Sequence, residues 1–147
     1  MPPQSASIDR LPDWARELLA TAPVARLGLL DADDRPRVLP VTFAVAGGEL
    51  WTAVDHKPKR TEGAELARVR WLRRNPAAAL TVDRYSDHWD RLAWVQALGT
   101  VDVLDEPAAE ALAALQAKYE PYRARPPGGP YLRLAPRRLL TWAADAL

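Results

Sequence analysis

The chain has 147 residues, a hydrophobic fraction of 48%, a charged fraction of 27% and a formal net charge of +1. A chain of this length can form one domain with its own core, and the composition is that of a soluble globular protein. The near-neutral charge argues against nucleic-acid binding, which usually needs a broad basic face. Because the chain has no cysteine, disulfides, thiolate catalysis and thiolate metal sites are excluded.

The N-terminal residues lack the apolar segment of a secretory signal, and no apolar run approaches roughly 18 residues, the length of a membrane-spanning helix. We therefore expect a cytoplasmic protein that does not enter the membrane. Residues 1–10 are expected to form a flexible arm and residues 11–147 a single domain, with no repeat or linker inside it.

The predicted elements alternate between helices and strands. Helical periodicity marks three stretches, at residues 12–22, 64–74 and from 105 onward. Strand patterns mark six, at residues 24–30, 37–46, 49–54, 77–83, 92–104 and 131–142. This order predicts an α+β fold with an antiparallel sheet, closed or nearly closed into a barrel with helices at its ends.

Two positions in the strand region have a specific meaning. Gly47-Gly48 predicts a tight hairpin turn between the second and third strands. Pro40 cannot donate a ladder hydrogen bond. It should therefore mark an edge strand, a bulge or a place where the backbone faces something other than a neighbouring strand.

The segment Val54–Thr61 carries three cations within four residues, namely Lys57, Lys59 and Arg60. A single lysine 4 Å from a phosphate contributes only about 1 kcal/mol in bulk water. Three cations, partly rigidified by Pro58, can converge on one multiply charged group, with Arg60 making a bidentate contact. The segment thus predicts an anion site, and a solvated charged loop is the alternative.

Other chemistry finds little support in the sequence. His56 and His88 each follow an aspartate, but no ligand spacing indicates a metal site, and no serine fits a catalytic triad. Glycine loops that cradle phosphates are absent. The arginines of residues 68–74 are interpreted as a solvated helix face that pairs with nearby acids. Tryptophans near the cationic segment either pack in the core or line a planar ligand.

An ordered set of segments resembles a known family. Ala25-Arg-Leu-Gly-Leu-Leu, Pro36-Arg-Val-Leu-Pro-Val-Thr-Phe43 and Leu50–Thr61 are similar to the pyridoxamine-phosphate-oxidase-like split β-barrel proteins that bind flavins or deazaflavins. The continuation through residues 66–94 resembles more narrowly their coenzyme F420-dependent oxidoreductase branch. The resemblance covers about residues 10–142.

The resemblance implies a mostly antiparallel, six-stranded split β-barrel with flanking helices. It also implies a homodimer with two cofactor clefts at the subunit interface. The resemblance places three residues along the deazaflavin ring, namely Pro40, Val41 and Thr42. It places Trp51, Thr52 and Val54 beside the ring or the ribityl chain. The phosphate and the acidic tail would contact Lys57, Lys59, Arg60 and Thr61. Residues that would cover the ring or substrate from the partner subunit are Tyr85, Trp89 and Trp94.

The implied activity is hydride transfer between F420 and a small conjugated or aromatic substrate. Reduced F420 donates the hydride itself, so the protein chiefly positions ring and substrate, and no catalytic residue is identified. Two alternatives remain open. One is an FMN-dependent enzyme of the same fold, and the other is a non-catalytic F420-binding or carrier protein.

Overall fold

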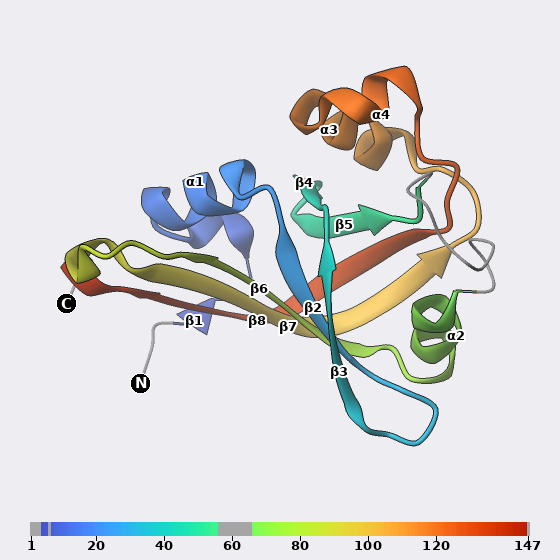
Figure 1. Ribbon diagram of the computed structural model, residues 1–147, viewed down its shortest axis with the longest axis horizontal. Coiled ribbons are helices and arrows are strands. Elements are labelled where there is room, and N and C mark those ends of the chain that lie inside the picture. Colours follow the sequence, from blue (N-terminus) through green and yellow to red (C-terminus); the bar gives the residue numbers. More distant parts are fainter. Residues whose placement is uncertain (1–3, 6, 56–65, 147) are drawn as a thin grey trace.

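The computed structural model describes residues 4–5, 7–55 and 66–146 as an α+β fold (Figure 1). The helices are α1 (Asp13–Thr21), α2 (Ala67–Arg74), α3 (Ala109–Lys118) and α4 (Glu120–Ala124), with short 3₁₀ turns η1 (Ile8–Arg10), η3 (Trp89–Arg91) and η4 (Ala144–Ala146). The strands are β1 (Gln4–Ser5), β2 (Ala25–Leu30), β3 (Pro36–Val41), β4 (Ala44–Ala46), β5 (Glu49–Ala53), β6 (Ala77–Arg84), β7 (Ala93–Leu104) and β8 (Tyr131–Ala143). No helix within these ranges combines the length and apolar character that crossing a lipid bilayer requires.

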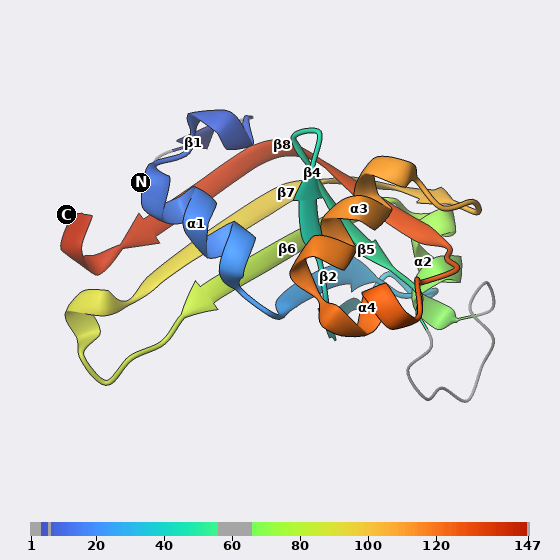
Figure 2. The same cartoon turned by 90° about the horizontal axis from the view of Figure 1, so that it is seen from above.

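The strands form one curled antiparallel sheet in the order β3-β2-β6-β7-β8-β5-β4, and β1 adds to β8. The long strands β7 and β8 pair along their whole length and form its centre. Helix α1 and the α3–α4 pair lie on one side of the sheet, whereas α2 packs beside β2 and β7 (Figures 1 and 2). The expected α+β fold with an antiparallel, barrel-like sheet is confirmed.

The expected count of six strands was too low, because within the described ranges seven strands follow the main order of the sheet and β1 adds an eighth. The predicted strand 37–46 is in fact two strands that separate at Thr42 and Phe43. β3 pairs with β2 at one edge of the sheet, while β4 pairs with β5 at the other edge. Between β3 and β4 the chain crosses from one edge of the sheet to the other. The residue pattern does not predict this crossing, because Val41 before it and Ala44 after it are both apolar and buried.

Both positional expectations for this region are confirmed. Pro40 lies in the edge strand β3, where its missing N–H leaves no ladder position unpaired within the sheet. Gly47 and Gly48 have φ values of 60° and 75° and connect β4 to β5 in two residues. Positive φ at both central positions is what the favoured hairpin turn requires.

The buried side chains of the described residues form two clusters. The larger one fills the curl of the sheet beneath α1 and includes Leu19, Leu27 and Leu139. The smaller one packs α3 and α4 against β5 and includes Trp51, Leu115 and Tyr131, with Tyr122. Consequently α3 and α4 are fixed to the strands that carry the candidate site described below.

The N-terminal residues differ from the expected flexible arm at 1–10. Gln4–Ser5 pairs with Leu139 and Leu140 of β8, and η1 follows. Ile8 is buried in the larger core. Where the structure describes it, this segment therefore packs on the domain, because an apolar side chain in η1 finds a place in the core.

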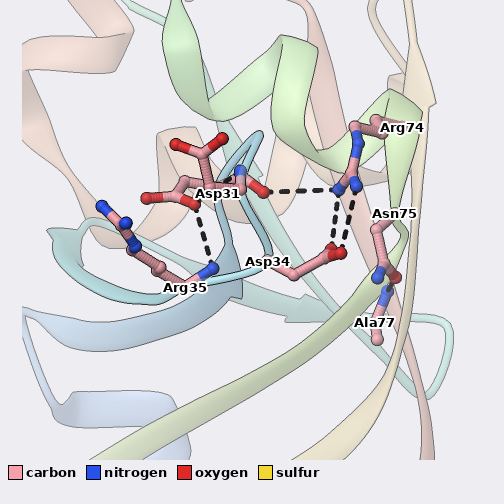
Figure 3. A network of polar contacts seen from close by, with 7 residues as sticks. Asp31, Asp34, Arg35, Arg74, Asn75 and Ala77 are labelled. Atoms are coloured by element: carbon pink, nitrogen blue, oxygen red, sulfur yellow. Dashed lines mark hydrogen bonds and ion pairs between the residues drawn. The ribbon is translucent and has the colours of Figure 1, made fainter.

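Helix α2 is anchored at its C-terminal end to the β2–β3 turn (Figure 3). Arg74 donates to both carboxylate oxygens of Asp34, at 2.8 and 3.2 Å, and to the carbonyl of Asp31 at 3.3 Å. Hydrogen bonding to Arg74 lowers the pKa of Asp34 below its ordinary value. This paired geometry fixes α2 so that its opposite end reaches the region where β3 and β5 end.

Gly99 provides a sharp test of the β7–β8 packing. It lies at a register shift next to Leu98, and a Cβ added there would lie 2.1 Å from the carbonyl oxygen of Ala135. We expect Gly99→Ala to lower the free energy of unfolding by about 1–3 kcal/mol or more, because the β8 backbone must move. Urea denaturation measures this change.

Gly128→Ala is the matched control, because a Cβ there would meet nothing within 4 Å. Its free energy of unfolding should change by less than about 0.5 kcal/mol. Equal stabilities for the Gly99 and Gly128 variants would contradict the described β7–β8 register.

Candidate functional site

A cleft of about 340 Å³ lies where β3 and β5 end and α2 begins. The described part of its lining is mostly apolar, with two hydroxyls, one carboxylate and one guanidinium. The lining residues are Val24, Pro40, Val41, Thr42, Thr52, Ala53, Val54, Asp55, Leu66 and Arg68. Such a mixture of apolar surface and a few polar groups is typical of a small-molecule site.

The backbone at the end of β5 is held by a loop that precedes β8. The N–H of Val54 donates to the carbonyl of Pro130 at 2.9 Å, and the N–H of Gly129 donates to the carbonyl of Val54 at 3.3 Å. Asp55 follows directly and lines the cleft. This wall of the cleft is therefore fixed through main-chain hydrogen bonds.

The opposite wall depends on Phe43, the residue at which the chain crosses from β3 to β4. The N–H of Phe43 donates to the hydroxyl of Tyr119 at 3.1 Å, and its carbonyl accepts from Lys118 Nζ at 3.0 Å. The Lys118 ammonium also donates to the carbonyl of Leu19 at 3.3 Å and lies 3.7 Å from the centre of the Phe43 ring. These contacts from α3 and its C-terminal end position the neighbouring Thr42.

A chain of three side chains links the two walls. Tyr122 of α4 is only 5% exposed, and its hydroxyl lies 2.6 Å from Thr42 Oγ1. The same hydroxyl donates to Asp55 Oδ2. The sequence interpretation missed both Tyr122 and Asp55 as site residues, because 67 residues separate them and no motif joins them.

Of the described residues predicted to bind the cofactor, five line this cleft: Pro40, Val41, Thr42, Thr52 and Val54. Trp51 does not. Its side chain is 4% exposed in the smaller core, and its indole N–H donates to the carbonyl of Ala46 at 3.1 Å. Adjacent residues of a strand point to opposite faces, so the strand that turns Thr52 to the cleft turns Trp51 toward α3.

The aromatic residues expected to cover the ring lie elsewhere in this chain. Trp89 in η3 is 71% exposed and Tyr85 is 69% exposed. Trp94 is half-buried in β7 and pairs with Trp142 of β8. The β6–β7 connection that carries Trp89 lies at the opposite end of the molecule from α2 (Figures 1 and 2).

The predicted anion-binding residues Lys57, Lys59, Arg60 and Thr61 lie outside the described residues, as does His56.

The arginines of α2 divide into two groups. Arg73 Nη2 lies 2.5 Å from Asp105 Oδ1 and Arg74 pairs with Asp34, which confirms for these two the expected pairing with acids. Arg68, one turn or more earlier, lines the cleft. Among the described residues, no group of three or more His, Cys, Asp or Glu is placed to hold a metal ion.

The sequence pattern of the family described as Pyridoxamine 5'-phosphate oxidase matches residues 11–143. The chain belongs to this family. The match includes every strand from β2 to β8 and the cleft between them. The family resemblance inferred from the ordered segments is thus confirmed.

Solved structures share the family's fold. An F420 reductase is 19% identical over 88% of this chain and 98% of its own, with a TM-score of 0.63. An FAD-binding protein from Mesorhizobium loti is 19% identical over 89% of this chain and 94% of its own, with a TM-score of 0.61. HutZ, a heme storage protein from Vibrio cholerae, is 15% identical over 92% of this chain and 99% of its own, with a TM-score of 0.69.

No curated protein matches the chain. At these levels of identity the solved structures establish the fold, and the ligands in their names, F420, FAD and heme, differ. The choice among such ligands must therefore come from the residues of this chain.

Lys118 gives the site a measurable pH dependence of stability. Burial lowers the pKa of Lys118 to about 8 from its ordinary value of 10.5. Between these values the unfolded chain binds more protons than the folded protein, so this residue makes the free energy of unfolding rise with pH. We expect Lys118→Met to lose that rise, as measured by urea denaturation from pH 7.5 to 10.5.

Comparing the two proteins at each pH removes the contribution of the tyrosines, which both share. Parallel stability curves for wild type and Lys118→Met would show that this amine titrates as an exposed lysine does.

Proposed function

We propose that the protein is an F420-dependent oxidoreductase that transfers a hydride between the deazaflavin and a small conjugated or aromatic substrate. The observation that carries the proposal is the cleft beside β3 and β5. It contains Pro40, Val41, Thr42, Thr52 and Val54, and it lies directly before the chain segment that holds Lys57, Lys59 and Arg60. Family membership and the fold shared with an F420 reductase support it.

The cleft suits a planar ring with an anionic tail. Its volume of about 340 Å³ lies within the range of roughly 300–1,000 Å³ usual for small-molecule sites. Apolar side chains such as Val41 and Val54 offer flat contact surface, while Thr42 and Thr52 offer hydroxyls. Arg68, near the N-terminal and electropositive end of α2, is placed to attract a phosphate or carboxylate.

The protein needs few catalytic groups of its own for this reaction. Bound F420 in its reduced form supplies the hydride. The protein binds the ring, holds the substrate against it and excludes water, and such positioning alone contributes much of a rate enhancement. An active site without a dedicated acid–base pair is compatible with this role.

The described part of the cleft offers less to heme than to an organic redox cofactor. Heme iron is normally held by a histidine, cysteine, methionine or tyrosine side chain. None of the ten described lining residues is of these types. The described histidine, His88, belongs to the β6–β7 connection, and this connection lies at the opposite end of the molecule from α2 (Figure 1). An organic redox cofactor fits the lining better. FMN is the alternative ligand, and a carrier protein that binds F420 without turnover is the alternative role.

We further propose that the protein acts as a cytoplasmic homodimer with a cofactor site at each end of the interface. Tyr85 and Trp89 are large and exposed, and they belong to the β6–β7 connection, which lies at the opposite end of the molecule from α2 (Figure 1). A second copy would bring them to the cleft, together with Trp94. Exposed tryptophan and tyrosine are the residues that most often anchor protein interfaces.

The cofactor proposal is tested by titrating the purified protein with F420 and with FMN while following tryptophan fluorescence. We expect micromolar or tighter F420 binding, and F420H2 oxidation with a suitable conjugated substrate. Arg68→Ala, Lys57→Ala and Arg60→Ala should each weaken F420 binding about tenfold or more, since each removes a charge-assisted contact.

Arg73→Ala is the matched control, because Arg73 lies on the same helix but pairs with Asp105. It should leave F420 affinity within about twofold. Binding of FMN without any response to F420 would refute the F420 assignment. F420 binding without oxidation of F420H2 by any candidate substrate would favour the carrier role.

The dimer is tested by sedimentation velocity over a range of protein concentrations. We expect a dimer whose dissociation constant rises about tenfold or more in Trp89→Ala, because exposed tryptophans act as interface anchors. The variant should fold normally, since the side chain is 71% exposed. A monomer at every concentration, with or without F420, would contradict the dimer proposal.

A further inference from the structure

The hydrogen-bond chain Thr42–Tyr122–Asp55 has a fixed direction of donation. The proposed function stated above does not depend on this direction. Tyr122 lies behind the cleft, and its hydroxyl contacts both Thr42 and Asp55, which line it. The three residues come from the end of β3, from α4 and from the end of β5. They are joined only by the fold, with 80 residues between Thr42 and Tyr122.

The direction follows from the donor inventory of the three groups. A carboxylate that is ionised at neutral pH only accepts hydrogen bonds, so the single Tyr122 proton is donated to Asp55. The Tyr122 oxygen can then only accept from Thr42, at 2.6 Å. The single hydroxyl proton of Thr42 is therefore committed, and toward any further partner Thr42 offers lone pairs alone.

Packing around Tyr122 keeps this direction fixed. Its ring makes an edge contact with Tyr119 at a centroid distance of 5.5 Å. Its main-chain carbonyl accepts from Gln116 Nε2 at 3.2 Å. Tyr119 in turn donates to the carbonyl of Pro23 at 2.8 Å and accepts from the N–H of Phe43. A reversed chain would leave the Tyr122 oxygen and the Asp55 carboxylate in contact with no proton between them, and the packing of the Tyr122 ring prevents the two groups from separating.

We propose that the Thr42–Tyr122–Asp55 chain sets the hydrogen-bond polarity of the cleft, so that this wall presents acceptors and selects ligands that bring an N–H or O–H donor to it. The proposal rests on the cofactor role proposed above and specifies how the ring is recognised. Flavin and deazaflavin rings carry an imide N–H, which meets this requirement. Ionised phosphates and carboxylates have no donor and belong with Arg68.

The same rule discriminates among the classes of ligand that the fold accommodates. An iron-bound porphyrin has no N–H, and its ionised propionates only accept. A ring whose imide nitrogen is methylated keeps its shape elsewhere but loses the donor. The cleft should therefore reject both relative to an unmodified flavin or deazaflavin ring.

The test compares F420 and FMN with their N3-methyl derivatives, using the full chain and calorimetric or fluorescence titration. We expect wild type to bind the cofactor that it accepts at least about tenfold more tightly than the methylated form. Tyr122→Phe frees the Thr42 hydroxyl to rotate, and the ratio should fall below about threefold. Tyr131→Phe is the matched control and should keep the wild-type ratio.

Tyr131 suits this purpose because its buried hydroxyl belongs to the same small core but donates to the carbonyl of Pro127. If Tyr122→Phe does not fold, the pair Thr42→Val and Thr42→Ser replaces it. Valine should abolish the preference and serine should keep it, because only serine retains an oxygen that can accept.

The possible outcomes separate the two proposals. Equal binding of methylated and unmethylated cofactor by wild type overturns the polarity rule and leaves the cofactor assignment intact. A preference that survives Tyr122→Phe unchanged also overturns it. Binding of hemin but of neither flavin overturns the proposed function, and the polarity rule with it. An Asp55 carboxyl that is protonated at pH 7 in carbon-13 NMR spectra overturns the direction of the chain without any ligand.

Discussion

The arrangement of the protein depends on the crossing of the chain at Phe43. There the polypeptide leaves one edge of the sheet at β3 and joins the other edge at β4. A main-chain segment outside the ladder needs other partners for its N–H and C=O groups, because buried unpaired groups are costly. Tyr119 and Lys118 supply these partners. The helix that covers the smaller core thus also holds the strand crossing in place.

The cleft is a consequence of that crossing. Where β3 ends, its continuation no longer lies beside β2, and no other strand of the described residues fills the space between Thr42 and the end of β5. Proline at position 40 is suited to the edge that remains, since it needs no ladder partner. Arg74, through Asp34, holds α2 so that Leu66 and Arg68 border the same space.

Most elements could be predicted from the sequence, because periodicity reports local burial. The observed ends of α1 and β7 lie within about two residues of the predicted ends, and the Gly47-Gly48 turn lies at the predicted position. The division of residues 37–46 could not be predicted, because a mostly apolar run with a single threonine in its middle looks the same in one strand as in two. Trp51 was assigned to the cofactor together with Thr52 because the family resemblance implies both. Which of two neighbours faces α3 depends on tertiary packing.

The number of arginines in α2 does not reveal which of them is available at the cleft. Arg68, Arg73 and Arg74 are equivalent in the sequence, yet the two later ones are matched by Asp105 and Asp34. What remains at the cleft is Arg68 on one element and Asp55 on another. A cavity with a cation and a fixed set of acceptors treats the two ends of a ligand differently. The orientation of a bound ring is therefore set by where the cleft places its cation and its acceptors, and the total positive charge of α2 does not determine it.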